Sequence, residues 1–169
     1  KQKLEVALPD HKTAIRYVFD ILKTVDKPIG GIGHRVVQGG WYFPESAVVT
    51  DETLAQVREV APLAPLHNYA EADVIEICRD MFPELGNVIV PDTAFHYNMP
   101  AEAHHYALPK EVVDSLHIRK YGAHGTSHRF IWRSVDEASN HTAHKVVSCH
   151  LGSGASLCAI EDGKCMDTT

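Results

Sequence analysis

The residues best suited to chemistry in this sequence form a glycine- and serine-rich stretch, 148–156, directly behind the apolar pair Val146 and Val147. A strand that runs into such a turn presents free backbone N–H groups and hydroxyls, which are the donors that a phosphate ligand needs. The stretch lacks the Gly-Lys-Ser/Thr ending of a P-loop and the third glycine of a dinucleotide fingerprint. It therefore indicates an anion site or, as a structural alternative, an ordinary hairpin turn.

Charged and imidazole side chains gather where predicted strands and glycine-rich turns end. The set comprises Arg35, His67, Asp92 and His124. In α/β sheets the carboxyl ends of strands are where ligands usually bind, so these residues are site candidates. Arg35 would capture a carboxylate or phosphoryl oxygen with its forked guanidinium, and Asp92 would orient a nucleophile or act through Mg²⁺. The structural alternatives are an ion pair for Arg35, a cap for Asp92 and a turn position for His124.

Two other kinds of site are disfavoured by spacing. A Ser-His-Asp hydrolase would need a serine in a Gly-x-Ser-x-Gly turn, which is absent from the sequence. The 12 histidines include two that are four residues apart, His124 and His128, but no His-Glu-x-x-His or Cys/His zinc spacing accompanies them, so no metal-binding residue is predicted. The four cysteines are scattered, which predicts reduced and mostly buried thiols.

The composition is that of an ordinary globular protein of one domain or one and a fraction. The chain has 169 residues, is 44% hydrophobic and carries a net charge of −6 without a basic cluster. Nucleic acid and anionic membrane surfaces are therefore not expected as partners. No segment approaches the roughly 20 apolar residues of a membrane span, and residues 1–5 do not resemble a signal peptide. We expect a cytoplasmic protein.

The elements that must position these residues alternate between strands and helices, which predicts an α/β layered fold. Strands are expected at 29–37, 47–49, 86–90, 145–149 and 157–160, with a brief one at 118–121. Helices are expected at about 10–22, 52–60, 68–81, 110–116 and 128–140. The expected N-caps are Asp10, Asn68 and either Thr126 or Ser127. Residues 61–68 are too rich in proline for a helix and predict an extended loop, and residues 93–109 predict an irregular stretch.

Taken together, several segments resemble the acetate kinase family in order and spacing. They are residues 33–40 (GHRVVQGG), 63–68 (LAPLHN), 92–96 (DTAFH), 119–128 (RKYGAHGTSH) and 148–156 (SCHLGSGAS). Their combination covers nearly the whole chain and is far more specific than any one motif. The resemblance implies the ribonuclease H-like (actin-like ATPase) fold, a mixed α/β sheet flanked by helices.

The resemblance also implies an activity, the reversible transfer of the γ-phosphoryl group of ATP to acetate, which gives acetyl phosphate and ADP with Mg²⁺. Matched position by position, it implies that Asp92 and His124 are catalytic, that Arg35, Val37, Leu66 and His67 bind the acyl substrate, and that His150, Leu151, Gly152, Ser153 and Gly154 bind the nucleotide phosphates. These residue types suit in-line phosphoryl transfer, because that reaction needs positioning and donors aimed at the equatorial oxygens.

The same resemblance implies how the chain is divided. Residues 1–143 would form most of an N-terminal acyl-substrate domain, and residues 144–169 the first strands of a nucleotide-binding domain. Further family motifs are expected before Lys1 and after Thr169, in a full-length homodimer, so that the polypeptide alone has little or no kinase activity.

Two alternatives remain open beside acetate kinase. One is a kinase for propionate or another short acyl chain, because Val37, Leu66 and Ala123 set the size of the pocket only roughly. The other is a non-catalytic remnant that binds a small anion. Pyrophosphate is a further candidate for the phosphoryl donor.

Overall fold

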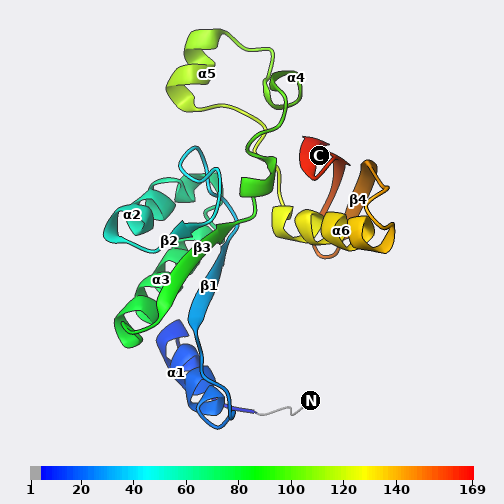
Figure 1. The fold of residues 1–169 in the computed structure, drawn as a ribbon. Helices are drawn as coiled ribbons and strands as arrows, with labels where there is room; N and C mark the ends of the chain where they lie inside the picture. The colour runs from blue at the N-terminus through cyan, green and yellow to red at the C-terminus, as the bar shows by residue number, and fades with distance from the viewer. Residues whose placement is uncertain (1–4) are drawn as a thin grey trace.

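The computed structural model describes residues 5–169; most of the segment that was considered above for a signal peptide, residues 1–4, lies outside them. The chain folds into two three-stranded sheets with helices beside them (Figure 1). The first sheet has the order β1-β3-β2 and contains β1 (Gly31–Val36), β2 (Ala47–Val48) and β3 (Gly86–Pro91). Strand β1 runs parallel to β3, and β2 runs antiparallel to it.

The second sheet is an antiparallel meander in chain order. It consists of β4 (Lys145–Leu151), β5 (Ala155–Glu161) and β6 (Lys164–Thr168). Strands β4 and β5 are the predicted hairpin, whereas β6 was not predicted. Its sequence, KCMDT, does not alternate clearly, and it is a strand because it pairs with the exposed edge of β5.

Helices accompany both sheets and also form an excursion between them. The helices are α1 (His11–Leu22), α2 (Asp51–Glu59), α3 (Asn68–Met81), α4 (Ala101–His104), α5 (Lys110–Leu116) and α6 (Gly125–Ala138), and the 3₁₀ turns are η1 (Ala61–Leu63) and η2 (Ala94–His96). Helices α2 and α3 lie beside the first sheet, α6 lies beside the second, α4 contacts β6, and α5 extends away from both sheets (Figure 1). Among residues 5–169, no helix is both long enough and apolar enough to cross a membrane.

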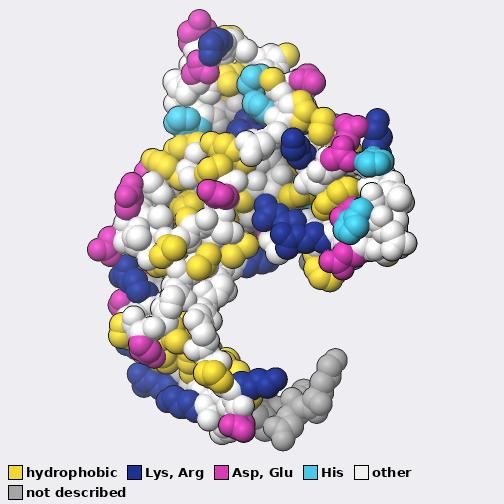
Figure 2. All heavy atoms as spheres, in the orientation of Figure 1, with side chains coloured by type: hydrophobic (Ala, Val, Ile, Leu, Met, Phe, Trp, Pro, Cys, Tyr) yellow, Lys and Arg dark blue, Asp and Glu magenta, His cyan; other side chains and the backbone are white. Residues whose placement is uncertain are grey.

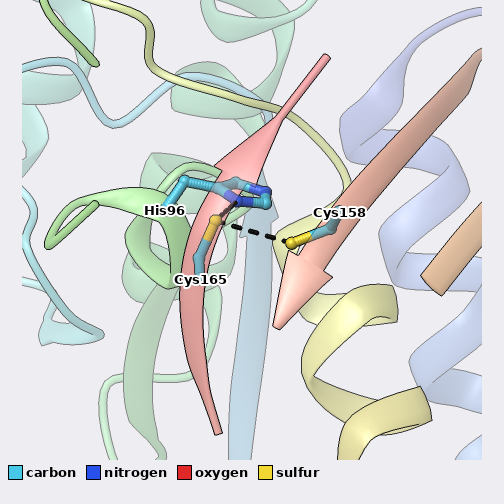
Figure 3. A group of neighbouring side chains, drawn as sticks. All are labelled: His96, Cys158 and Cys165. Carbon is cyan, nitrogen blue, oxygen red and sulfur yellow. Dashed lines mark hydrogen bonds between the residues drawn. The ribbon is translucent and has the colours of Figure 1, made fainter. Parts of the chain in front are cut away.

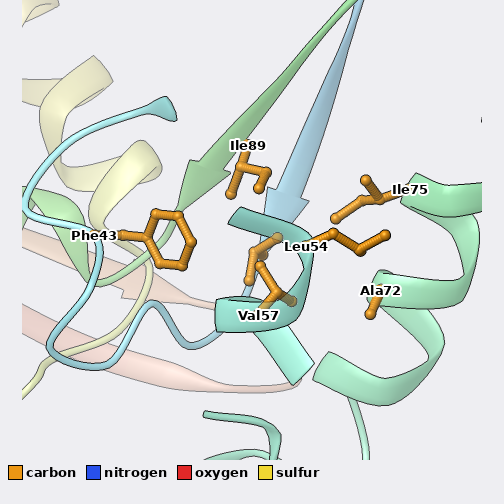
Figure 4. Close-up of a cluster of buried hydrophobic side chains, with 7 residues drawn as sticks. Phe43, Leu54, Val57, Ala72, Ile75 and Ile89 are labelled. Carbon is orange, nitrogen blue, oxygen red and sulfur yellow. The ribbon is translucent and has the colours of Figure 1, made fainter. Parts of the chain in front are cut away.

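The larger core lies between the first sheet and the two helices beside it. Its buried members are Val36, Phe43, Leu54, Val57, Ala72, Ile75 and Ile89 (Figure 4). Strands β1 and β3 contribute one residue each, Phe43 comes from the loop after β1, and α2 and α3 contribute two residues each at helical spacing, as the predicted periodicity requires. A second, smaller core of Met99, Cys158, Ile160 and Cys165 supports the other sheet.

The first helix packs loosely against the rest of the chain. Asp10 caps it as predicted, and its carboxylate accepts a hydrogen bond from the backbone of Thr13 at 2.7 Å. No residue of α1 is fully buried, and its main aromatic contact is the stack of Phe19 on Phe82. In the space-filling view, apolar side chains are exposed among charged ones on the face shown (Figure 2).

Two predicted helix caps are wrong. Helix α3 begins at Asn68 itself, and the Asn68 side chain instead bonds the backbone of Gln38 twice, accepting from its N–H and donating to its carbonyl. Helix α6 begins at Gly125, with His124 as its N-cap in the left-handed region, so neither Thr126 nor Ser127 caps it. In both cases a contact with a distant segment, rather than a local side-chain bond, sets where the helix starts.

Two loop predictions and one strand prediction also need correction. Within residues 61–68 the chain forms the 3₁₀ turn η1, because Pro62 suits the first turn of a helix. Residues 93–109 are not wholly irregular, since they contain η2 and α4. Residues 118–121 form no strand; the Arg119 guanidinium donates to the carbonyl of Tyr97 at 2.7 Å, so side-chain contacts hold this segment in place.

Candidate active site

The arginine and the aspartate that the sequence singled out are partners. The two strands that carry them, β1 and β3, are parallel and in register, so Arg35 near the end of β1 lies beside Asp92, which directly follows β3. The guanidinium donates to both carboxylate oxygens of Asp92, from Nε at 3.2 Å to each and from Nη2 at 2.6 Å to Oδ2. The Asp92 side chain is only 2% exposed, whereas that of Arg35 is 59% exposed.

The ion pair is asymmetric in a way that matters for ligand binding. Hydrogen bonding to Asp92 raises the pKa of the Arg35 guanidinium above its usual value. The carboxylate is buried and fixed, but the guanidinium is open to solvent on its other side and can bind a second anion there. The predicted alternative of a structural ion pair and the predicted ligand role are therefore compatible at Arg35.

The histidine enters the same site through the start of α6. The N–H of Gly125 donates to the Asp92 carbonyl at 2.9 Å, which joins the end of β3 to the helix N-terminus. His124 precedes this contact with φ of 55°, and its Nδ1 lies 2.8 Å from the hydroxyl of Ser156. Its Nε2 faces Gly154, because a Cβ added to that glycine would lie 3.2 Å from it.

A chain of buried hydrogen bonds continues behind His124. Ser156 also contacts Nε2 of His128 at 2.9 Å, and Nδ1 of His128 contacts the hydroxyl of Ser148 at the same distance. Burial, followed by the nearby imidazole of His96, lowers the pKa of His128 to about 4. Burial and then His150 lower the pKa of His124 below its usual value. Both imidazoles are therefore neutral at pH 7.

The glycine- and serine-rich stretch forms the end of β4, the turn at residues 152–154 and the start of β5. The N–H of Gly152 donates to the carbonyl of Gly154 at 3.0 Å, and within residues 5–169 the N–H groups of Ser153 and Gly154 have no hydrogen-bond partner. His150 stacks on His124 with ring centroids 4.1 Å apart, and its Nδ1 contacts the Ser127 hydroxyl at 2.9 Å. The turn thus presents backbone donors next to His124.

These groups line one cleft of about 800 Å³. Its lining comprises Arg35, Val37, His67, Asp92, Ala123, His124, Thr126, Ser127, Phe130, His150, Ser153 and Gly154. The structure thereby brings together most of the residues singled out in the sequence. It leaves three aside: Leu66 is 89% exposed, and Leu151 and Gly152 do not line the cleft.

Several residues of the site lie in segments that the sequence analysis named, but it gave them no individual role in the site. Ser156, His128 and Ser148 act from behind the cleft, while Thr126 reaches an Asp92 oxygen at 3.4 Å. Glu71 accepts the N–H of Val37 at 3.0 Å, and burial raises its pKa above the usual value. Alternation along β4 and β5 could have indicated Ser148 and Ser156, because both are buried polar residues on the inward face of their strands.

The close approach at Gly125 yields a first prediction. A Cβ at this position would overlap the Asp92 carbonyl oxygen, which is fixed backbone. We expect Gly125→Ala to lower the free energy of unfolding by about 1–3 kcal/mol, because α6 must move away from β3. Urea unfolding measures this loss of stability. Gly33→Ala is the matched control, since a Cβ there would meet no atom within 4 Å, and an equal loss of stability in both variants would contradict the prediction.

Solved structures of known proteins define the class of fold to which the chain belongs. The chain has the α/β fold of the actin-like ATPases. A propionate kinase from Francisella tularensis superimposes with a TM-score of 0.87 at 42% identity, covering 94% of this chain and 42% of that one. An acetate kinase from Porphyromonas gingivalis gives a TM-score of 0.86 at 36% identity, covering 98% of this chain and 44% of that one.

The particular family follows from the sequence match. The chain belongs to the acetokinase family, whose pattern it matches over residues 1–169. It is 46% identical to acetate kinase 2 of Clostridium perfringens over 100% of its own length and 45% of that protein. The chain thus spans less than half the length of the curated relatives it matches.

Proposed function

We propose that the whole protein is an acetate kinase, which transfers the γ-phosphoryl group of ATP reversibly to acetate. The observation that carries this proposal is the convergence of Arg35, Asp92 and His124 in one cleft of about 800 Å³. A guanidinium, a carboxylate and an imidazole around one space supply the positioning and charge stabilisation that phosphoryl transfer requires. The kinase names of the similar proteins support the same reading.

In this proposal Arg35 binds the acetate carboxylate and the migrating phosphoryl oxygens. Asp92 fixes the guanidinium in the required orientation through three hydrogen-bond contacts. Val37 and Ala123 are apolar parts of the lining and would contact the methyl group of acetate, with His67 at the rim. Leu66, which the resemblance assigned to the same wall, would have to turn inward to take part.

His124 would act as a neutral hydrogen-bond donor to the phosphoryl group during its transfer. We assign the protons so that Ser148 donates to His128, His128 donates to Ser156, and Ser156 donates to Nδ1 of His124. Each of these groups then has a partner, and the N–H of His124 lies at Nε2, which faces Gly154. The buried chain thus sets the tautomer that the reaction needs.

The turn between β4 and β5 would hold the phosphates of ATP. Two observations support this role. Ser153 and Gly154 line the cleft together with His124 and His150, and within residues 5–169 their backbone N–H groups have no hydrogen-bond partner and are free to bind an anion. The part of the cleft formed by described residues holds one carboxylate, Asp92, and Arg35 engages both of its oxygens. These residues do not by themselves fit a Mg²⁺ site, so we propose that Mg²⁺ arrives bound to the nucleotide.

We also propose the domain division of the sequence analysis. Residues 1–143 would bind the acyl substrate and residues 144–169 would begin the nucleotide-binding domain, which agrees with the presence of two separate sheets. We infer a cytoplasmic homodimer for the whole protein, with acetate, acetyl phosphate, ATP and ADP as its small-molecule partners.

The direct test is an assay of the whole protein with acetate, ATP and Mg²⁺, in which acetyl phosphate is trapped as its hydroxamate and ADP is measured separately. We expect the two products in equal amounts, and little or no turnover from the 169-residue polypeptide alone. If the whole protein binds acetyl phosphate without turnover, it is a non-catalytic anion-binding protein and the proposal is wrong.

Propionate is the second candidate substrate, on a specific observation. The cleft wall beside His124 is Ala123, a small side chain that leaves room for a longer acyl chain, and a propionate kinase is among the similar structures. One methylene group is worth about 1–3 kcal/mol in a pocket. The ratio of kcat/KM for acetate and propionate in the whole protein therefore separates the two substrates.

A further inference from the structure

Outside the cleft, three side chains that can bind a metal lie together in the second core. They are His96 from η2, Cys158 from β5 and Cys165 from β6 (Figure 3). The two sulfur atoms are 3.5 Å apart, and Nδ1 of His96 is 3.1 Å from the sulfur of Cys165. All three ligand atoms lie within 4.8 Å of one another.

The imidazole of His96 is already in the tautomer that a metal ligand needs. Its Nε2 lies 2.8 Å from the carbonyl oxygen of Ala123, and since a carbonyl can only accept, Nε2 carries the proton. The lone pair is therefore on Nδ1, on the side of the cysteines. A histidine that ligates through one nitrogen and donates to a carbonyl through the other is the usual second-shell arrangement of metal sites.

Burial and charge then select the kind of ion. His96 is 0% exposed, Cys158 1% and Cys165 3%, so any charge placed here must be balanced locally. The two negative charges of two thiolates balance the two positive charges of a divalent cation, and the neutral imidazole adds none. A monovalent ion would leave one negative charge buried. Sulfur and imidazole ligands together favour zinc over magnesium or calcium.

We propose that His96, Cys158 and Cys165 form a structural zinc site that holds the second sheet against η2. Binding replaces the two thiol protons, which pass to solvent, with two Zn–S bonds, and adds one Zn–N bond to His96. With Zn–S bonds of about 2.3 Å at a tetrahedral angle, the sulfurs would be about 3.8 Å apart, so the two sulfur atoms need to separate by only a few tenths of an ångström from their 3.5 Å distance. A water molecule would complete the coordination.

The site would also stiffen the cleft, although it is separate from the proposed kinase function. The imidazole of His96 holds the Ala123 carbonyl, directly before His124, and packs against Gly122, where an added Cβ would overlap its ring. Zinc would thereby link β5 and β6 to the segment that positions His124.

The test measures zinc directly and needs no activity. The purified protein is stripped with a chelator under reducing conditions, then titrated with Zn²⁺, and with Co²⁺ as a spectroscopic probe. We expect one equivalent of zinc, thiolate-to-cobalt charge-transfer absorption with tetrahedral visible bands, and a rise in the thermal unfolding midpoint on zinc addition. Cys158→Ala and Cys165→Ser should each lower zinc affinity at least 100-fold.

Matched controls come from the other two cysteines. Cys78→Ala removes a buried thiol on α3 and Cys149→Ala an exposed one on β4, and both should retain zinc and the cobalt spectrum. If the unsubstituted protein shows no stoichiometric zinc, no thiolate-to-cobalt band and no thermal shift, the proposal is wrong.

Discussion

Replacing Arg35 by lysine in the whole protein should lower kcat/KM for acetate by about 10²–10³-fold, even though the positive charge is kept. The reason is geometric: Arg35 uses Nε and Nη2 on Asp92 and keeps the rest of its planar fork for a second anion. Lysine supplies a point charge on a flexible stem and cannot hold both partners in one plane. Arg35→Gln should be at least as severe, because it removes the charge as well. Steady-state assays with acetate and ATP measure the effect.

Arg58 offers a matched control for this experiment. Its guanidinium also joins two carboxylates, Asp73 at 3.0 Å and Glu76 at 2.9 Å, but it does so on the surface between α2 and α3. Arg58→Lys should therefore leave kcat/KM unchanged within a factor of about two, since surface ion pairs contribute little. If Arg35→Lys retained activity within a few-fold of the unsubstituted protein, Arg35 would be only a structural partner of Asp92.

Replacing His124 by alanine should lower kcat by about 10²–10³-fold, because the donor at Nε2 is lost while the rest of the cleft remains. The pH dependence gives a sharper test. Burial and then His150 lower the pKa of His124, so the neutral imidazole persists at acid pH and is lost only below the usual value of 6.5. Activity should therefore be present at pH 7 and fall as the pH drops through this lowered pKa.

The His150→Ala variant should shift the pH at which activity falls on acidification, although it also removes a residue that lines the cleft. Without the neighbouring imidazole the pKa of His124 rises towards its usual value, so the fall in activity should begin at a higher pH. His144→Ala, which alters an exposed histidine paired with Asp162, should leave the profile in place. An activity that increases on acidification through this range would mean that the imidazolium is the working form, and would contradict the neutral donor.

Much of the fold could be predicted from local pattern. The strands β1, β3, β4 and β5 and the body of each helix from α1 to α3 occur where periodicity placed them, because alternation and helical repeats report which face of an element is buried. The errors lie at element ends and in short segments. Asn68 was a plausible cap by residue type, yet its amide is used by Gln38, which is 30 residues earlier in the chain.

The sequence indicated most of the residues that line the candidate site, but not which of them contact one another. Motif order indicated Arg35, Asp92 and His124, whereas nothing in the sequence showed that Ser156 hydrogen-bonds both His124 and His128. The zinc ligands show the same limit more strongly: His96 and Cys165 are 69 residues apart, so a search for ligand spacing in the sequence could not join them.

The sequence by itself determined the types of the main elements, the family of the chain and the polar groups available for chemistry. The tertiary structure decided how those groups are paired: Arg35 with Asp92 across 57 residues, and His124 with Ser156 across 32. The physical reason is the range of the forces involved. Side-chain periodicity and backbone preference act over a few neighbouring residues, whereas these pairings exist only once the strands are in register and α6 is seated against the end of β3.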